Sequence, residues 1–154
     1  MQNEEKKYEA LRLKNQLCFP IYAVSNMIIR KYKQYLKELD LTYTQYITMM
    51  LLWENTSFTM GEFCKELYLN SGTLSPVLQR LEEKGYIERL HLEEDERYLV
   101  AITTDEGDAL REKALKIPEK IAKQFNIEPE EAKELYRILY KILEQEETSM
   151  KGMD

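Results

Sequence analysis

The chain has 154 residues, 44% apolar and 32% charged, a composition that suits one soluble domain with its own core. Two cysteines and one histidine argue against a zinc site and a structural disulfide, and there is no apolar run long enough to span a membrane. We therefore expect no metal, no cofactor and no membrane partner. The first 16 residues are too charged for a signal peptide, so we expect a cytoplasmic protein.

The net charge of −6 is unevenly distributed. Residues 1–39 hold 8 basic and 4 acidic side chains, whereas residues 59–103 hold 5 basic and 9 acidic ones. An acidic total disfavours nucleic-acid binding, because attraction to phosphates needs local positive charge. Only the surface that touches DNA has to be positive, however, so the total does not exclude DNA binding.

The first half of the chain predicts helices separated by short breaks. Pro20 suits the first turn of a helix that we expect over residues 20–39. Thr44 is the expected cap of a second helix. Thr59 and Glu62 form the S/T-x-x-E pattern of a capping box, which predicts a short third helix.

The stretch NSGTLSPVLQRLEEKG predicts another capped helix, with Ser71 or Thr73 as the expected cap. Pro76 fits this helix if it lies in the first turn, and Gly85 is a good C-terminal stop. Two short runs rich in β-branched and aromatic residues follow, YIERLHL and RYLVAIT. The polar turn EEDE between them predicts a β-hairpin.

The last third of the chain predicts two long helices with apolar stripes, the second of them starting at Pro129. Helices with spare apolar faces at both ends of a chain commonly bury these faces in a two-fold dimer, which we prefer to a monomeric helical core. The stripe of the first helix comprises Leu110, Ala114, Ile117, Ile121 and Phe125.

Together these elements predict a mainly α-helical protein with a small β-hairpin: a winged helix-turn-helix with N- and C-terminal dimerisation helices. We expect a single domain over residues 1–154. Residues 40–103 would form the winged part, and residues 1–39 and 104–148 the dimerisation helices. The helix after NSG is then the recognition helix, and the EEDE turn is the tip of the wing.

The predicted recognition helix has no acidic side chain over residues 70–79. Short polar side chains suit phosphates and base edges, and a helix N-terminus also favours a phosphate. The alternative is a capped surface helix beside a solvated hairpin. The predicted DNA contacts on this helix are Asn70, Ser71, Thr73, Ser75, Gln79 and Arg80.

Four segments, in unbroken order from about residue 11 to residue 125, carry a resemblance to a known family. They read NQLCFPIYAVS, LTYTQYITMMLLWE, LYLNSGTLSPVLQRLEEKGYIER and EEDERYLVAIT. Together they resemble the organic hydroperoxide resistance regulators with one sensing cysteine, a branch of the MarR-type repressors. This resemblance implies a dimeric winged-helix repressor, not an enzyme, that senses organic peroxides through a cysteine near its N-terminus.

The resemblance also implies roles for particular residues. The sensing cysteine matches Cys18. The two tyrosines that reach the reactive sulfur from the partner subunit match Tyr32 and Tyr43, and further pocket positions match Phe19 and Tyr22. On the DNA side, the matching positions are Ser71, Thr73 and Arg80 on the recognition helix and the pair Asp95 and Arg97 at the wing.

The sequence departs from the family pattern in three respects. Asn26 stands where close relatives carry an arginine, and the wing approach RLHLEEDER is more acidic than in relatives. No cysteine follows Cys64, so the resolving cysteine of the two-cysteine subgroup is absent. Cys64 itself falls on an apolar helix face with Phe63, which favours a buried core residue over a second redox thiol.

Cys18 would lie just before the first turn of the helix that Pro20 begins. A thiolate attacks peroxides, and the positive end of a helix macrodipole stabilises that anion. Attack gives a sulfenic acid, which a second thiol converts to a disulfide. Because Cys64 is expected in the core, we predict that a small cellular thiol caps Cys18 or that Cys18 is over-oxidised. From composition alone, a packed apolar side chain is the alternative.

The preferred function is a repressor that binds an inverted-repeat operator of double-stranded DNA as a homodimer. Oxidation of Cys18 by organic hydroperoxides would release the operator. The first alternative is a MarR-type repressor released by a phenolic ligand. The second is a thiol peroxidase, for which the sequence offers no second exposed cysteine.

Overall fold

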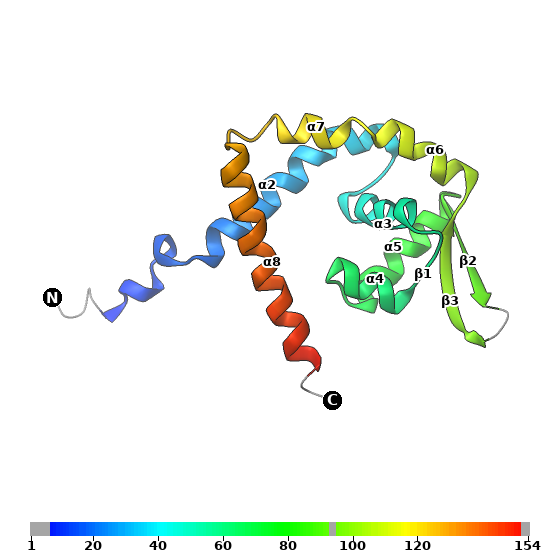
Figure 1. The fold of residues 1–154 in the computed structure, drawn as a ribbon, viewed down its shortest axis with the longest axis horizontal. Helices are drawn as coiled ribbons and strands as arrows, with labels where there is room; N and C mark the ends of the chain where they lie inside the picture. Colours follow the sequence, from blue (N-terminus) through cyan, green and yellow to red (C-terminus); the bar gives the residue numbers. More distant parts are fainter. Residues whose placement is uncertain (1–6, 93–94, 152–154) are drawn as a thin grey trace. The chain divides into compact units, whose positions relative to one another are not determined.

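The computed structural model describes residues 7–92 and 95–151, with the side chains of residues 92, 95–98 and 146–151 outside the description. The chain forms two compact units, Met1–Pro118 and Glu119–Asp154, and each is described by itself. Figure 1 gives the order of the elements. None of the described helices has the length and apolar character needed to span a bilayer.

The first unit contains the winged helix-turn-helix. After the short 3-10 helices η1 (Glu9–Leu11) and η2 (Leu13–Asn15), its elements are α2 (Cys18–Leu36), η3 (Lys37–Leu39), α3 (Tyr43–Glu54), β1 (Phe58–Thr59), α4 (Met60–Leu67), α5 (Ser71–Glu83), β2 (Ile87–Leu92), β3 (Asp95–Thr103) and α6 (Asp105–Ala114). The mainly helical fold with a β-hairpin is as predicted. The additional strand β1 was not predicted from the sequence.

Capping boxes begin α3 and α4. The Thr59 amide donates to Glu62 Oε2 at 2.7 Å, which confirms the predicted box of α4. In α3 the cap is Thr42: its hydroxyl accepts from the Gln45 amide at 3.3 Å, and the Gln45 side chain accepts from the Thr42 amide at 3.0 Å. The prediction of Thr44 was wrong, because only Thr42 has a glutamine or glutamate three residues later.

Asn70 caps α5, because its Oδ1 accepts from the Thr73 amide at 2.8 Å. The predicted caps, Ser71 and Thr73, therefore lie inside the helix. Pro76 is also inside α5, beyond the first turn where we expected it, so the Gly72 carbonyl lacks the amide partner that a helix interior supplies.

Gly85 ends α5 as predicted, with φ 73° in the left-handed region. The Tyr86 amide donates to the Leu81 carbonyl at 3.0 Å, and the Gly85 amide donates to the Glu82 carbonyl at 2.9 Å. This pair of hydrogen bonds is a Schellman motif, which turns the chain sharply from α5 into β2.

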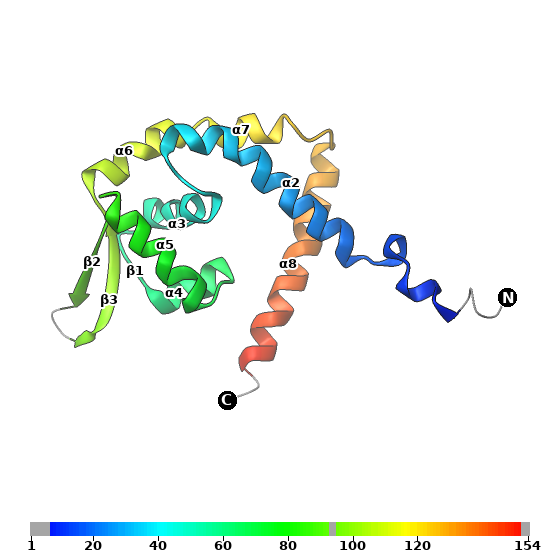
Figure 2. The same cartoon turned by 180° about the vertical axis from the view of Figure 1, so that it is seen from behind.

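The sheet is antiparallel with strand order β1-β3-β2. The predicted hairpin is confirmed: β2 pairs with β3 from Ile87 opposite Thr103 to Leu92 opposite Asp95, with an irregularity at His91. Figure 2 shows this hairpin as a projecting wing beside α5. Residues 93–94, within the predicted EEDE tip, lie outside the described residues.

The core of the first unit lies between the C-terminal end of α2, the helices α3 to α5 and the sheet. Side chains from each of these elements are almost completely buried, which fixes the recognition helix on one face of a rigid body. The most deeply buried side chains include Leu36, Met49, Phe63, Leu74, Leu81 and Ile87.

The long helix predicted to carry the stripe from Leu110 to Phe125 is broken in the structure. Helix α6 ends at Ala114, and α7 spans Ile117–Ala122. Pro118 explains the break, because its ring would displace the carbonyl of Ala114 and it has no amide to donate to it. In the second unit, α8 (Pro129–Lys151) begins at Pro129 as predicted.

Candidate functional site

Cys18 is the first residue of α2, and its thiol is free and exposed. The sequence predicted that the helix starts at Pro20. It starts two residues earlier, because a proline needs no amide partner anywhere in the first turn. Leu17, at the N-cap, supplies no side-chain cap. The thiol therefore sits at the N-terminal, positive end of a 19-residue helix.

The residues next to Cys18 are also exposed. Phe19 is 42% and Tyr22 66% exposed, and the buried residue of α2 is Leu36, at the opposite end. In Figure 1 the N-terminal half of α2 extends away from α3, α4 and α5. The predicted pocket residues Phe19 and Tyr22 thus lie near the thiol and remain largely exposed within their own unit.

Tyr32 and Tyr43 form a separate cluster near the other end of α2. Their ring centroids are 4.9 Å apart, and the Tyr46 ring lies 5.8 Å from that of Tyr32. Burial, with smaller contributions from Tyr43 and Tyr46, raises the pKa of Tyr32 to about 12. Burial also raises the pKa of Tyr43. Both phenols therefore remain protonated hydrogen-bond donors at neutral pH.

Cys18 and the tyrosine pair cannot meet within one chain. Tyr32 lies 14 residues after Cys18 on the same helix, so roughly 21 Å of helix separates them. No pair of side chains spans that distance. The structure thus brings Tyr32 and Tyr43 together, and Phe19 and Tyr22 lie near Cys18 on α2. Within one chain the predicted site residues form two separate groups.

The predicted DNA contacts on α5 are exposed. Ser71, Ser75 and Gln79 follow one another at helical spacing on one side of the helix, and Thr73 and Arg80 lie on another exposed side. Two of these side chains have partners on the same helix. Gln79 Nε2 donates to Glu83 Oε1 at 3.0 Å, and Arg80 Nη1 lies 2.9 Å from Glu83 Oε2.

The remaining predicted contacts have different positions. Asn70 is exposed, but its amide oxygen is used as the cap of α5. The side chains of Asp95 and Arg97 lie outside the described residues, although the backbone of both belongs to β3. Cys64 is half-buried in α4 rather than buried as expected, and its neighbour Phe63 fills the core position.

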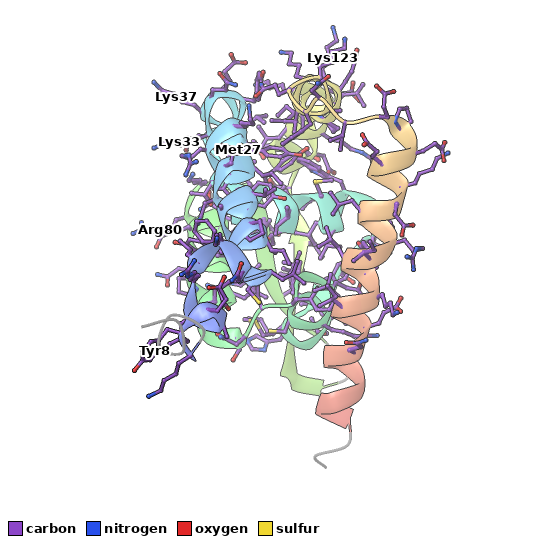
Figure 3. All side chains as sticks on the ribbon, turned by 90° about the vertical axis from the view of Figure 1, so that its left-hand side faces the viewer. Tyr8, Met27, Lys33, Lys37, Arg80 and Lys123 are labelled. Atoms are coloured by element: carbon purple, nitrogen blue, oxygen red, sulfur yellow. The ribbon has the colours of Figure 1, made fainter. Side chains whose placement is uncertain are left out.

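Sequence reasoning missed a groove of about 520 Å³ beside the tyrosine pair. Basic residues at helical spacing on α2 line this groove. That spacing is visible in the sequence and indicates a basic side of the helix. In Figure 3, Lys33 and Lys37 project on the same side as Arg80. The lining residues are Ile29, Arg30, Lys33, Lys37, Asp40, Leu41, Thr42, Tyr43 and Lys84.

Comparison with known proteins identifies the family. Residues 30–113 match the model of the transcriptional regulator SarA/Rot family. The chain is 42% identical, over 91% of its length and 95% of the relative's, to an organic hydroperoxide resistance transcriptional regulator of Bacillus subtilis. The chain belongs to the organic hydroperoxide resistance regulators of the MarR family.

Other relatives agree with this assignment to the MarR family. The regulator SarZ of Staphylococcus aureus is 41% identical over 80% of this chain and 83% of its own. Reduced AbfR bound to DNA has a TM-score of 0.74 at 33% identity and covers 92% of this chain and 98% of its own. Overoxidised AbfR bound to DNA has a TM-score of 0.73 at 35% identity, covering 90% and 98%. AbfR is a protein of Staphylococcus epidermidis.

No cluster of three or more His, Cys, Asp or Glu side chains that could hold a metal ion occurs in the described part of this MarR-family chain.

Proposed function

We propose that this MarR-family protein is a cytoplasmic transcriptional repressor that binds an inverted-repeat DNA operator as a homodimer. Oxidation of Cys18 by an organic hydroperoxide releases the operator. One observation carries the proposal: an exposed thiol begins α2, and a pair of protonated phenols lies out of its reach on the same chain. A second subunit completes the site.

The dimer brings the two halves together. The exposed first half of α2 and the apolar side chains of α8 supply the surface that a two-fold interface needs. Each Cys18 then faces Tyr32 and Tyr43 of the partner, whose hydroxyls donate to the thiolate. Phe19 and Tyr22 add an apolar wall, which favours an organic hydroperoxide over hydrogen peroxide.

The redox step is a nucleophilic displacement. The Cys18 thiolate attacks one oxygen of the hydroperoxide, an S–O bond forms and the O–O bond breaks. The leaving alkoxide takes up a proton and departs as an alcohol, while the sulfur, oxidised by two electrons, becomes a sulfenic acid. A small cellular thiol then attacks the sulfenic sulfur, giving a mixed disulfide and water.

The exposed face of α5 reads the operator. Ser71, Thr73 and Ser75 suit phosphates and base edges near the helix N-terminus. Arg80 reaches DNA by exchanging Glu83 for a phosphate or a guanine edge, since an exposed pair on one helix is weak. Asp95 and Arg97 remain the proposed wing contacts.

The groove beside Tyr43 favours a second candidate, a MarR-family repressor released by a phenolic acid. The groove combines apolar walls from Ile29 and Leu41 with several cations, which suits an aromatic ring with a carboxylate. Salicylate would then release DNA equally well from wild type and Cys18→Ser.

Gel shifts with the operator separate these candidates and test the proposal. Reduced wild type and the control Cys64→Ser should bind DNA and lose it on treatment with an organic hydroperoxide and a small thiol. Cys18→Ser should bind DNA and keep it. Release of the operator from oxidised Cys18→Ser would show that Cys18 is not the sensor.

A further inference from the structure

Lys84 joins the end of the recognition helix to the connection between α2 and α3. It is the C-cap residue of α5, and its side chain is only 24% exposed. The Nζ atom lies 3.1 Å from Asp40 Oδ2 and 3.4 Å from Gln45 Oε1, and it also donates to the Asp40 carbonyl. The acceptors of this one ammonium group thus all lie within residues 40–45.

The segment that Lys84 holds includes Tyr43. Asp40, before Tyr43, has a left-handed backbone with φ 51°, and Gln45, after it, is buried. Gln45 Oε1 also accepts from the Thr42 amide, so Lys84 touches the very group that caps α3. The ammonium group therefore contacts the chain on both sides of Tyr43.

We propose that Lys84 is the positioning residue that couples Tyr43 to the recognition helix. The inference rests on the proposed function, in which oxidation of Cys18 displaces Tyr43 of the partner subunit. A displacement of Tyr43 moves its flanking residues. The Lys84 side chain is half-buried, and three acceptors around one ammonium group hold it more firmly than a single exposed ion pair would, so Lys84 follows them and tilts the end of α5.

The other cations of the groove have no such attachment. Among the described residues, no carboxylate forms an ion pair with Arg30, Lys33 or Lys37, whereas Lys84 has Asp40. Lys33 and Lys37 are exposed and project away from the unit in Figure 3. Lys37 is thus a matched control: a lysine of the same groove whose side chain forms no ion pair with Asp40.

The test compares the operator Kd of reduced and oxidised protein in Lys84→Met, Asp40→Asn, the double variant and Lys37→Met. Asparagine tolerates the left-handed backbone at position 40, so that variant keeps the turn and loses the charge. Mass spectrometry follows the oxidation of Cys18 in each sample. The ratio of oxidised to reduced Kd measures the coupling, for which factors of about 5–150 are typical.

Lys84→Met should oxidise at Cys18 at the wild-type rate and bind the operator when reduced, but its Kd ratio should fall at least about fivefold below that of wild type. Asp40→Asn should lower the ratio by less, because Lys84 keeps the Asp40 carbonyl and Gln45 as acceptors. The double variant should lower it no further than Lys84→Met, which already removes every contact of the ammonium group. Lys37→Met should keep the wild-type ratio.

An unchanged Kd ratio in both Lys84→Met and Asp40→Asn would overturn the coupling role and leave the proposed function intact. So would a loss of affinity that is equal in the reduced and oxidised states, because it would make Lys84 a DNA contact or a structural residue. Wild-type protein that retains its operator after Cys18 is oxidised would instead contradict the proposed function, and the coupling with it.

Discussion

Single residues determine the chemistry of this regulator through their electrostatic surroundings. Cys18 lies at the positive, N-terminal end of α2. Burial raises the pKa values of Tyr32 and Tyr43, so both phenols are neutral hydrogen-bond donors. The redox proposal needs such donors beside the Cys18 sulfur.

The raised tyrosine pKa predicts a loss of stability in alkali. The folded protein holds the Tyr32 proton up to about pH 12, whereas an unfolded tyrosine releases it at about pH 10. The contribution to the unfolding free energy is therefore complete below pH 10 and disappears as the pH rises toward 12. Between pH 9 and pH 11, the unfolding free energy measured with urea should fall less for Tyr32→Phe than for wild type. The exposed Tyr22→Phe is the control, and equal losses in all three proteins would refute the assignment.

At the scale of elements, local pairs of residues were predictable and long-range contacts were not. Thr59 with Glu62, the stop at Gly85 and the hairpin follow from short patterns. The caps at Thr42 and Asn70 were misplaced by one to three residues because several polar residues cluster before each helix. The contact between Lys84 and Asp40 joins residues 44 positions apart, so no local sequence pattern predicts it. The roles of Cys18, Tyr32 and Tyr43 came from resemblance to a family.

The cap of the recognition helix gives a stability prediction. Asn70→Ala removes the acceptor of the Thr73 amide and should lower the unfolding free energy by about 1 kcal/mol. Asn70→Ser should recover most of this loss, because serine also caps well. Chemical denaturation measures both. A fully stable Asn70→Ala would indicate that another group satisfies the amide.

The start of α6 packs too closely for any side chain at position 107. A Cβ on Gly107 would lie 2.0 Å from the Tyr86 carbonyl oxygen, and the Gly107 carbonyl accepts from Trp53 Nε1 at 3.0 Å. Gly107→Ala should therefore destabilise the protein by about 1–3 kcal/mol or more. Gly61→Ala, which meets nothing within 4 Å, should be neutral or stabilising by up to about 1 kcal/mol. Thermal unfolding of the two variants provides the comparison.

For the protein as a whole, the proposed sensing site needs two chains. Within one chain most of the length of α2 separates Cys18 from Tyr32, so we propose that the partner subunit supplies the tyrosines. The net charge of −6 is compatible with DNA binding because the recognition face lacks acids over residues 70–79. The apolar residues of α2 and α8 predict an interface from the sequence alone. The geometry of that interface depends on both chains.

Mixed dimers test the shared site. In a dimer of one Cys18→Ser chain and one Tyr32→Phe/Tyr43→Phe chain, the remaining Cys18 faces intact tyrosines only if they come from the partner. Its oxidation rate should match wild type, while the Tyr32→Phe/Tyr43→Phe homodimer should oxidise about tenfold more slowly, as loss of hydrogen bonds to a charged group predicts. Slow oxidation in the mixed dimer would place the tyrosines in the same chain as the thiol.

We infer that the chemical state of Cys18 sets the affinity for the operator. The most direct measurement is operator binding before and after one equivalent of an organic hydroperoxide with a small thiol, with mass spectrometry of Cys18 in the same sample. The mixed disulfide and the overoxidised forms of Cys18 are counted separately. We predict that the fraction of released operator follows the fraction of Cys18 in the mixed disulfide. Operator that stays bound when Cys18 is fully converted to the mixed disulfide would show that Cys18 does not control DNA binding.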